Sequence, residues 1–340
     1  MEDQIKILVV EDSLLMQKIL VDLLQSDPQI RVIGTARDGE EALSKIALLK
    51  PDVVTLDIEM PRMNGLTTVR KIMETNPLPV VMVSALTQRE AQLTLKALEY
   101  GAVDYVPKPS GQISLNMDVV KDELISKVKT AASANIRRDK PKMAEIPEPS
   151  KPKSNEKIIS MAASTGGPAA VAYILKNIPE NSPPILVVQH MKKGMTKLFA
   201  EMLNQECKIG VKEAEDGDVV REGLAMIAPG GFHMLVMKSG RIKLTTGPPV
   251  NYVRPSADVT MKSAAKAYGS KNIGVILSGM GVDGAKGIEA IKKKGGLTIA
   301  QDEKTCVVFG MPNAAIKTKC VDFVLPLDYI PKLIIKACED

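Results

Sequence analysis

Short apolar segments and helical patterns alternate along both halves of this 340-residue chain, and this alternation constrains its fold more than any other feature. The first half opens with an apolar run at residues 5–10. A helical pattern follows, in which Leu15, Ile19 and Leu23 recur at helix spacing and Ser13 is available as an N-cap. Strand–helix alternation predicts a parallel sheet with helices on both faces. The other expected strands are 31–36, 53–56, 80–83 and 104–106, and the other expected helices are 40–49, 66–74, 88–100 and 117–131.

Repeated strand–helix units of this kind, (βα)5 in all, fit the flavodoxin-like doubly wound fold, in which the ligand site lies at the carboxyl ends of the strands. After them the periodic pattern dissolves, and prolines alternate with Lys, Glu and Ser over residues 131–155. This composition predicts a semi-rigid extended linker. We therefore expect two α/β domains, 1–130 and 156–340.

The alternation resumes after the linker and predicts a second parallel α/β sheet. Residues 218–246 depart from it, because turns at 229–231 and 239–240 separate apolar runs. This spacing predicts an antiparallel insert. The expected strands are 158–162, 185–189, 209–213, 273–277, 297–300 and 323–325, and the expected helices are 171–177, 195–206, 257–268, 284–293 and 329–337.

The composition is that of a globular protein, with 45% hydrophobic and 25% charged residues. A net charge of +5 is too small to indicate nucleic-acid binding, and a chain without Trp and with 3% aromatic residues offers few platforms for base stacking. The four cysteines show no C-x-x-C spacing, which argues against a zinc or redox motif. No signal peptide and no apolar stretch of about 20 residues is visible. We therefore expect a cytoplasmic protein that binds no nucleic acid and does not insert into a membrane. Our expectation for the oligomeric state is a monomer.

Acidic residues follow two of the expected strands in the first half. Glu11 and Asp12 come just after the first strand, and Asp57 just after the third. At one edge of a parallel sheet these carboxylates would suit Mg²⁺, which prefers oxygen ligands. Ser84 and Lys108 end the next two strands and would contact phosphoryl oxygens on Asp57, whose carboxylate would form an acyl phosphate. The alternative is that Glu11 and Asp12 only cap the first helix and that Lys108 is a surface charge.

Residues 9–13, 56–61, 84–85 and 108–109 resemble the response-regulator receiver family, and the resemblance covers residues 1 to about 125. It implies phosphotransfer from a histidine kinase to Asp57, with Mg²⁺ as the cofactor. Glu59 joins Glu11, Asp12 and Asp57 in the metal site that it implies. It further implies that Ser84 and Tyr105 rearrange together on phosphorylation. The Lys108–Pro109 bond is expected to be cis.

A serine, a histidine and an aspartate each follow an expected strand in the second half. Ser164 lies between a strand and a helix among small residues, His190 ends the next strand, and Asp283 again separates a strand from a helix. A parallel sheet would bring them together as a triad in which the imidazole deprotonates the serine and the aspartate orients the imidazole. His233, in the expected insert, is the alternative base. A serine at such a turn is also common as a simple helix cap.

Two other motifs bear on this hydrolase hypothesis. The nucleophile elbow G-x-S-x-G is absent because residue 162 is Ala, and the order Ser…His…Asp differs from that of α/β-hydrolases. Residues 279–284 match G-x-G-x-x-G, and Asp302 lies about where a ribose-binding acid would, so a dinucleotide-dependent oxidoreductase is an alternative. Against it, Asp283 would place a carboxylate in a loop that must cradle a pyrophosphate. A receiver with a binding output such as DNA control is a further alternative, although no helix-turn-helix pattern is visible.

Residues 163–168, 189–191, 228–234 and 278–285 resemble the catalytic domain of chemotaxis protein-glutamate methylesterases, and the match runs from about residue 156 to the C-terminus. The resemblance implies the triad Ser164, His190 and Asp283, with the Met280 backbone as oxyanion donor and no cofactor for the esterase. It implies hydrolysis of γ-glutamyl methyl esters on chemoreceptors with release of methanol, together with deamidation of receptor glutamines. With the receiver ahead of it, the whole chain resembles a phosphorylation-controlled enzyme of two-component chemotaxis signalling. The short linker further suggests that the unphosphorylated receiver covers the esterase site.

Overall fold

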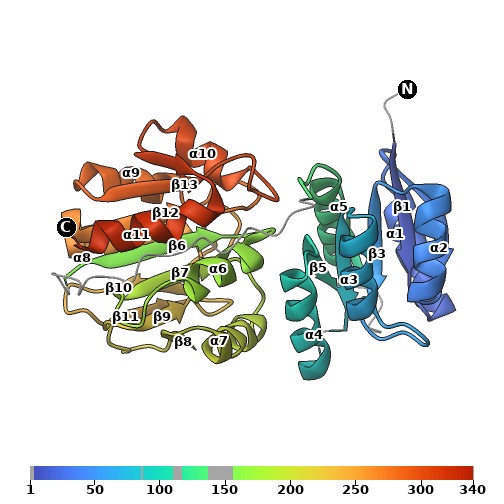
Figure 1. Ribbon diagram of the computed structural model, residues 1–340, viewed down its shortest axis with the longest axis horizontal. Coiled ribbons are helices and arrows are strands. Elements are labelled where there is room, and N and C mark those ends of the chain that lie inside the picture. Colours follow the sequence, from blue (N-terminus) through green and yellow to red (C-terminus); the bar gives the residue numbers. More distant parts are fainter. Residues whose placement is uncertain (1–3, 86, 110–116, 137–155, 340) are drawn as a thin grey trace. The chain divides into compact units, whose positions relative to one another are not determined.

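The computed structural model describes residues 4–85, 87–109, 117–136 and 156–339. The chain divides into two compact units, 1–138 and 139–340. Each unit is built on its own parallel β-sheet with helices packed against it (Figure 1). The expected linker at 131–155 lies mostly outside the described residues. Within the described part of the chain, no helix combines the length and the apolar character needed to cross a membrane.

The first unit is a five-stranded parallel sheet whose strand order matches the predicted flavodoxin-like fold. Its strands are β1 (Ile5–Val10), β2 (Ile30–Ala36), β3 (Val53–Asp57), β4 (Val80–Ser84) and β5 (Asp104–Pro107), arranged β2-β1-β3-β4-β5. Strands β3 and β4 are buried at every position, as strands covered on both faces must be. The helices are α1 (Leu14–Gln25), α2 (Gly39–Leu49), α3 (Gly65–Thr75), α4 (Gln88–Glu99) and α5 (Met117–Ala132).

Of two local predictions for the first unit, the N-cap at Ser13 is confirmed and the cis proline bond is not. Ser13 caps α1 by accepting a hydrogen bond from Met16 N at 3.4 Å. The prediction of a cis Lys108–Pro109 bond is wrong: the bond is trans, and the cis bond found among the described residues is Arg254–Pro255. Trans is the isomer that X–Pro bonds prefer unless the surrounding fold selects the other.

The second unit is a seven-stranded sheet in which every neighbouring pair is parallel. The strand order is β14-β13-β12-β6-β7-β9-β8. The central strand β6 is fully buried, so the sheet is the core of this unit. The sheet strands are β6 (Ile158–Ala163), β7 (Ile185–Gln189), β8 (Gly210–Glu213), β9 (Leu224–Ile227), β12 (Asn272–Ile276), β13 (Leu297–Gln301) and β14 (Phe323–Leu325), and the helices are α6 (Gly167–Lys176), α7 (Met195–Glu206), α8 (Ala257–Tyr268), α9 (Ala285–Lys293), α10 (Met311–Lys317) and α11 (Ile330–Glu339).

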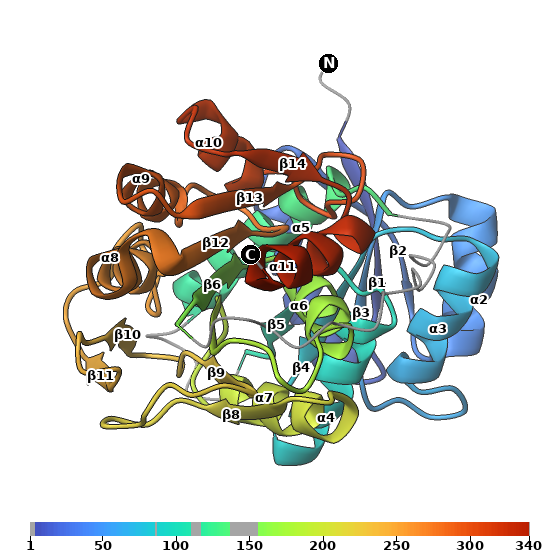
Figure 2. The same ribbon diagram turned by 60° about the vertical axis from the view of Figure 1, so that its left-hand side comes forward.

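The antiparallel insert expected at 218–246 is confirmed only in its second part. Strands β10 (His233–Val236) and β11 (Ile242–Thr245) form an antiparallel hairpin, which Figure 2 shows beside α8. Strand β9, in contrast, lies between β7 and β8 and pairs with both in parallel. All four of its residues are apolar and buried, so its sequence shows no one-sided pattern from which a direction could be predicted.

The strand order determines where the site can form. Strands β12, β6 and β7 are direct neighbours in the sheet (Figure 1), so the loops that follow them meet at its carboxyl edge. Backbone hydrogen bonds join these loops, from Ser164 N to Ser278 O at 3.0 Å and from His190 N to Ala163 O at 3.1 Å. Gly279 packs directly on the serine, because a Cβ at position 279 would lie 2.8 Å from Ser164 Cβ. A side chain at this position would push the loops apart.

Candidate functional site

The acidic residues predicted for the first unit meet at the carboxyl edge of its sheet. Glu11, Asp12 and Asp57 each offer an oxygen, and these atoms lie within 4.8 Å of one another. Lys108 Nζ lies 2.9 Å from Glu11 Oε2 and 2.8 Å from Asp57 Oδ2. One ammonium thus faces three carboxylates, and this excess of hard oxygen ligands fits a divalent cation such as Mg²⁺. Glu59 lies outside the group; its half-exposed carboxylate is 3.6 Å from Arg89 Nε, and its part in a metal site stays a prediction.

Burial dominates the electrostatics of this acidic group. Burial, and then repulsion by Asp57, raises the pKa of Glu11 to about 7, although Lys108 opposes the shift. Burial also raises the pKa of Asp57, again against the effect of Lys108. For Lys108 burial acts to lower the pKa, but the hydrogen bonds with Asp57 and Glu11 outweigh it and raise the pKa. The carboxylates are therefore held close together at an electrostatic cost, as in a site built to receive positive charge.

The predicted switch serine is held by a residue that sequence reasoning missed. Ser84 Oγ donates to Glu90 Oε2 at 3.0 Å, and Ala85 N donates to the same oxygen at 2.6 Å. Ser84 stands at the end of β4, where it is expected to contact a phosphoryl group on Asp57. Thr87, three residues before Glu90, caps α4 by accepting a hydrogen bond from Glu90 N at 3.3 Å. The spacing T-x-x-E was the available sequence signal.

Tyr105, the other predicted switch residue, is buried. Lys127 Nζ lies 4.8 Å from the centroid of its ring and donates to its carbonyl oxygen at 2.5 Å. The same ammonium lies 2.9 Å from Asp104 Oδ1. Its position between α5 and β5 ties the aromatic residue to the helix that precedes the linker.

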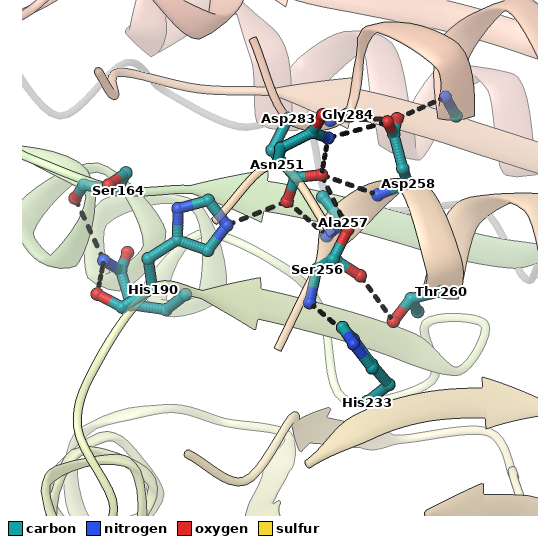
Figure 3. Close-up of polar contacts among 12 residues, drawn as sticks. Ser164, His190, His233, Asn251, Ser256, Ala257, Asp258, Thr260, Asp283 and Gly284 are labelled. Carbon is teal, nitrogen blue, oxygen red and sulfur yellow. Dashed lines mark hydrogen bonds and ion pairs between the residues drawn. The ribbon is translucent and has the colours of Figure 1, made fainter. Parts of the chain in front are cut away.

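In the second unit, the predicted histidine and aspartate are hydrogen-bonded. His190 Nε2 lies 2.9 Å from Asp283 Oδ2, and the side chains are 11% and 3% exposed. Asp283 accepts four further hydrogen bonds (Figure 3): from Asn251 Nδ2 at 2.9 Å, Ser256 Oγ at 2.7 Å, Ala257 N at 2.6 Å and Asp258 N at 3.2 Å. Burial acts to raise the pKa of Asp283, but the hydrogen bond and the charge interaction with His190, and then the hydrogen bonds from Ser256 and Asn251, lower it to about 2.

The ionised Asp283 determines which nitrogen of His190 is basic. Because the carboxylate can only accept, His190 Nε2 must carry the proton and donate it, which leaves Nδ1 unprotonated. Figure 3 shows His190 between Ser164 and Asp283, with the other ring nitrogen on the Ser164 side. Within the residues that the structure describes, no hydrogen bond joins the Ser164 hydroxyl to His190. Such bonds often form only when substrate is present.

A second buried carboxylate, Asp258, completes this network. Its Oδ1 accepts from Gly284 N at 3.1 Å and Gly287 N at 2.8 Å, and its Oδ2 accepts from Asn251 Nδ2 at 3.0 Å. Asp258 belongs to the first turn of α8 and caps α9, whereas Asp283, just before α9, caps α8. Each helix N-terminus is thus capped by a carboxylate from the start of the other, where the helix dipole stabilises negative charge. Sequence reasoning missed these partners, because Ser256 before a helical pattern predicts an ordinary N-cap.

This network argues against the dinucleotide alternative. A pyrophosphate would need the free N–H groups at the start of α9. Those of Gly284 and Gly287 already bind Asp258, which is 1% exposed. The carboxylate of Asp258 therefore already occupies the N-terminus of α9, where a pyrophosphate would have to bind.

The alternative base, His233, lies in a different environment. Its Nδ1 accepts from Ser256 N at 3.2 Å, and its Nε2 lies 3.0 Å from Pro248 O. Both ring nitrogens of this buried residue thus bind backbone groups, which favours a structural role. Met280, in contrast, directly follows Gly279 on the serine side of the site and is half-exposed. Its N–H as an oxyanion donor stays a prediction.

A receiver-type acidic site and a serine-hydrolase arrangement on two α/β units define a class, the response regulators with an enzymatic output domain. The chain matches the family models for the response regulator receiver domain over residues 7–119 and for the CheB methylesterase over residues 159–334. The chain belongs to the CheB methylesterase family and carries a receiver domain ahead of the family's catalytic domain.

Relatives of this chain share its whole length. It is 51% identical to a protein-glutamate methylesterase/protein-glutamine glutaminase of Pyrococcus horikoshii, over 99% of this chain and 94% of that protein. It is 44% identical to the protein of the same name from Halalkalibacterium halodurans, over 100% of both. Among solved structures, the CheB methylesterase catalytic domain of Thermotoga maritima is 45% identical and aligns with a TM-score of 0.52, over 53% of this chain and 98% of that one.

Proposed function

We propose that this protein is a phosphorylation-controlled methylesterase, which hydrolyses γ-glutamyl methyl esters on chemoreceptors and deamidates receptor glutamines in chemotactic adaptation. The observation that carries the proposal is the hydrogen bond between His190 and the ionised Asp283, on loops that converge with Ser164. Ester hydrolysis and deamidation are both acyl transfers at a side-chain carbonyl, so one serine site serves both. The relatives, whose names combine the two activities, support this double assignment.

The mechanism follows from the proton positions. Ser164 Oγ attacks the ester carbonyl carbon while His190 Nδ1 accepts its proton, and the imidazolium is stabilised by Asp283. The backbone N–H of Met280 donates to the oxyanion of the tetrahedral intermediate. His190 then protonates the departing methoxide oxygen, methanol leaves, and an acyl-enzyme remains. Water, deprotonated by the same nitrogen, attacks the acyl carbon and releases glutamate and free serine. With a glutamine substrate, ammonia leaves in place of methanol.

The receiver supplies the control. A histidine kinase transfers a phosphoryl group to Asp57, and Glu11, Asp12 and Asp57 would hold Mg²⁺, which neutralises charge on the phosphoryl oxygens when bound. Lys108 contacts one of these oxygens. Ser84 turns towards another when it leaves Glu90, and Tyr105 moves with it. The unphosphorylated receiver restrains the esterase, and phosphorylation shifts this two-state equilibrium towards the active form.

The test of the catalytic assignment is methanol release from methylated receptor membranes. Ser164→Ala should lower the rate by about 10⁴-fold or more, and His190→Ala should approach that loss. His233→Ala is the matched control, since it also removes an imidazole, and should keep most of the activity at temperatures where it is folded. Retained activity in Ser164→Ala would exclude the serine mechanism.

The test of the receiver assignment is the same assay with and without a small-molecule phosphodonor. The phosphodonor should raise the rate of the native chain and leave that of Asp57→Asn unchanged. Equal stimulation of both proteins would show that control does not pass through Asp57.

A further inference from the structure

A strained turn beside the esterase site carries a fully exposed tyrosine. Val250 and Val253 exchange two backbone hydrogen bonds of 3.1 Å, so Asn251 and Tyr252 are the central residues of a tight turn. Both have positive φ, +53° and +65°. Turns of this kind favour Asn followed by Gly, because a bulky side chain in the left-handed region is strained. Tyr252 is 101% exposed, so no packing within the described chain offsets this strain.

The turn is anchored to the catalytic network. Asn251 Nδ2 donates to both Asp283 Oδ1 and Asp258 Oδ2, as Figure 3 shows. The tyrosine that follows is therefore held at a fixed place beside the site. Backbone strain at such a position points to a function for the side chain, because folding alone would favour glycine there.

Two other exposed apolar side chains lie on the loop that carries Asp283. Val282, just before it, is 58% exposed, and Met280, just after the glycine that packs on Ser164, is 50% exposed. Apolar side chains exposed together next to a reactive group indicate a contact surface. On the histidine side of the site, the exposed Lys192 and Lys193 follow His190 and add positive charge.

We infer that Tyr252, Met280 and Val282 form the docking surface for the receptor segment that bears the ester, a segment with apolar and acidic side chains next to the modified glutamate. This inference rests on the proposed function. An ester at the end of a short side chain reaches Ser164 only if its own backbone lies against the rim of the site. The apolar rim then buries the apolar side chains of that segment, and the lysines attract its carboxylates.

The experiment compares two substrates with the full-length chain in the presence of phosphodonor. Tyr252→Ala and Tyr252→Gly should each raise KM for methylated receptor membranes about tenfold, with little change in kcat. Hydrolysis of an uncharged small ester, the γ-methyl ester of N-acetylglutamic acid α-methylamide, should stay within twofold of the native rate. Tyr329→Ala is the matched control: it removes a half-exposed tyrosine that follows β14 and should change neither rate. Added salt should raise KM for the receptor and not for the small ester.

Other outcomes would overturn the inference. If KM for the receptor were unchanged in both Tyr252 variants, the side chain would make no contact with the receptor. The same would follow if only Tyr252→Gly kept the native KM, because glycine removes the side chain without straining the turn. If the Tyr252 variants lowered kcat/KM equally for the receptor and for the small ester, the turn would act only by positioning Asp283. If the Tyr252 variants hydrolysed receptor esters faster than the native chain without phosphodonor, the partner of this surface would be the receiver of this chain and not the receptor. Failure of the proposed function is distinct, because the native chain would then release no methanol from receptors.

Discussion

Replacing Asp283 with Asn should separate the electrostatic work of this carboxylate from its shape. Asp283 Oδ1 accepts three hydrogen bonds, one of them from Asp258 N, and Oδ2 accepts two, one of them from Ala257 N. Whichever way the amide is turned, its NH₂ group faces a backbone N–H, which is also a donor and cannot accept a hydrogen bond. One buried donor is left unsatisfied, which costs about 1–3 kcal/mol. The lost charge at the start of α8 costs about 1 kcal/mol more.

The effect on the reaction should be much larger. With an amide NH₂ towards His190, Nε2 becomes the acceptor and the ring proton moves to Nδ1, which can then no longer take a proton from Ser164. With the amide oxygen there, the imidazolium loses its counter-charge. Either arrangement should lower kcat by about 10⁴-fold. Methanol release at saturating phosphodonor measures the rate, and urea unfolding of the same samples measures the stability.

Asp258→Asn is the matched control for this variant. Asp258 is equally buried and also caps a helix, but it does not touch His190. Its amide can keep both backbone bonds at Oδ1, so we expect a stability loss of about 1–2 kcal/mol and a rate within about tenfold of the native chain. If Asp283→Asn kept more than about a hundredth of the native kcat, or if Asp258→Asn lost as much, the tautomer argument would be refuted.

Three further outcomes follow from the structure. The pKa of Asp283 is about 2 in the folded chain and 3.8 in the unfolded chain, so the folded chain binds this proton more weakly. The ionised carboxylate therefore stabilises the fold by about 2 kcal/mol. This stabilisation is complete above the unfolded pKa and is lost as pH falls through about 2. The difference in unfolding free energy between the native chain and Asp283→Asn should therefore shrink between pH 5 and pH 2. Glu90→Ala removes the carboxylate oxygen that accepts from both Ser84 Oγ and Ala85 N, so half-maximal activation should need about tenfold less phosphodonor. An unchanged requirement would mean that Glu90 does not restrain the switch. Lys108→Met leaves Glu11 and Asp57 buried without their cation, and should lower the stability of the receiver unit by about 3–5 kcal/mol in urea titrations without Mg²⁺.

Much of both sites was predictable because the residues follow strand ends. In a parallel sheet, chain position fixes the edge at which a residue such as Asp57 or Ser164 emerges, so local patterns suffice to bring the groups together. The direction of β9 was not predictable in this way, because an apolar run of four residues pairs in either direction and β9 inserts between the preceding strand, β8, and the more distant β7.

The supporting residues were harder to foresee. Asn251 and Asp258 matter only because the starts of α8 and α9 meet, which no local pattern records. Glu90 did carry a signal, the T-x-x-E spacing, but that spacing predicts that the glutamate returns to the backbone of Thr87. In the structure it binds Ser84 instead. The placement of α4 next to the end of β4 thus decides between two hydrogen bonds that the sequence allows equally.

The exchange of carboxylates between α8 and α9 has a consequence for how this enzyme can change over evolutionary time. Residues that perform a reaction usually weaken the fold, and a lineage that abandons the reaction regains stability by replacing them. Asp283 is an exception, because the charge that serves the histidine also holds a helix in place. A descendant that no longer needed the reaction would still be selected to keep an acceptor at this position. An aspartate here in a distant homologue would therefore be weak support for activity, and the state of Ser164 and His190 would be the better guide.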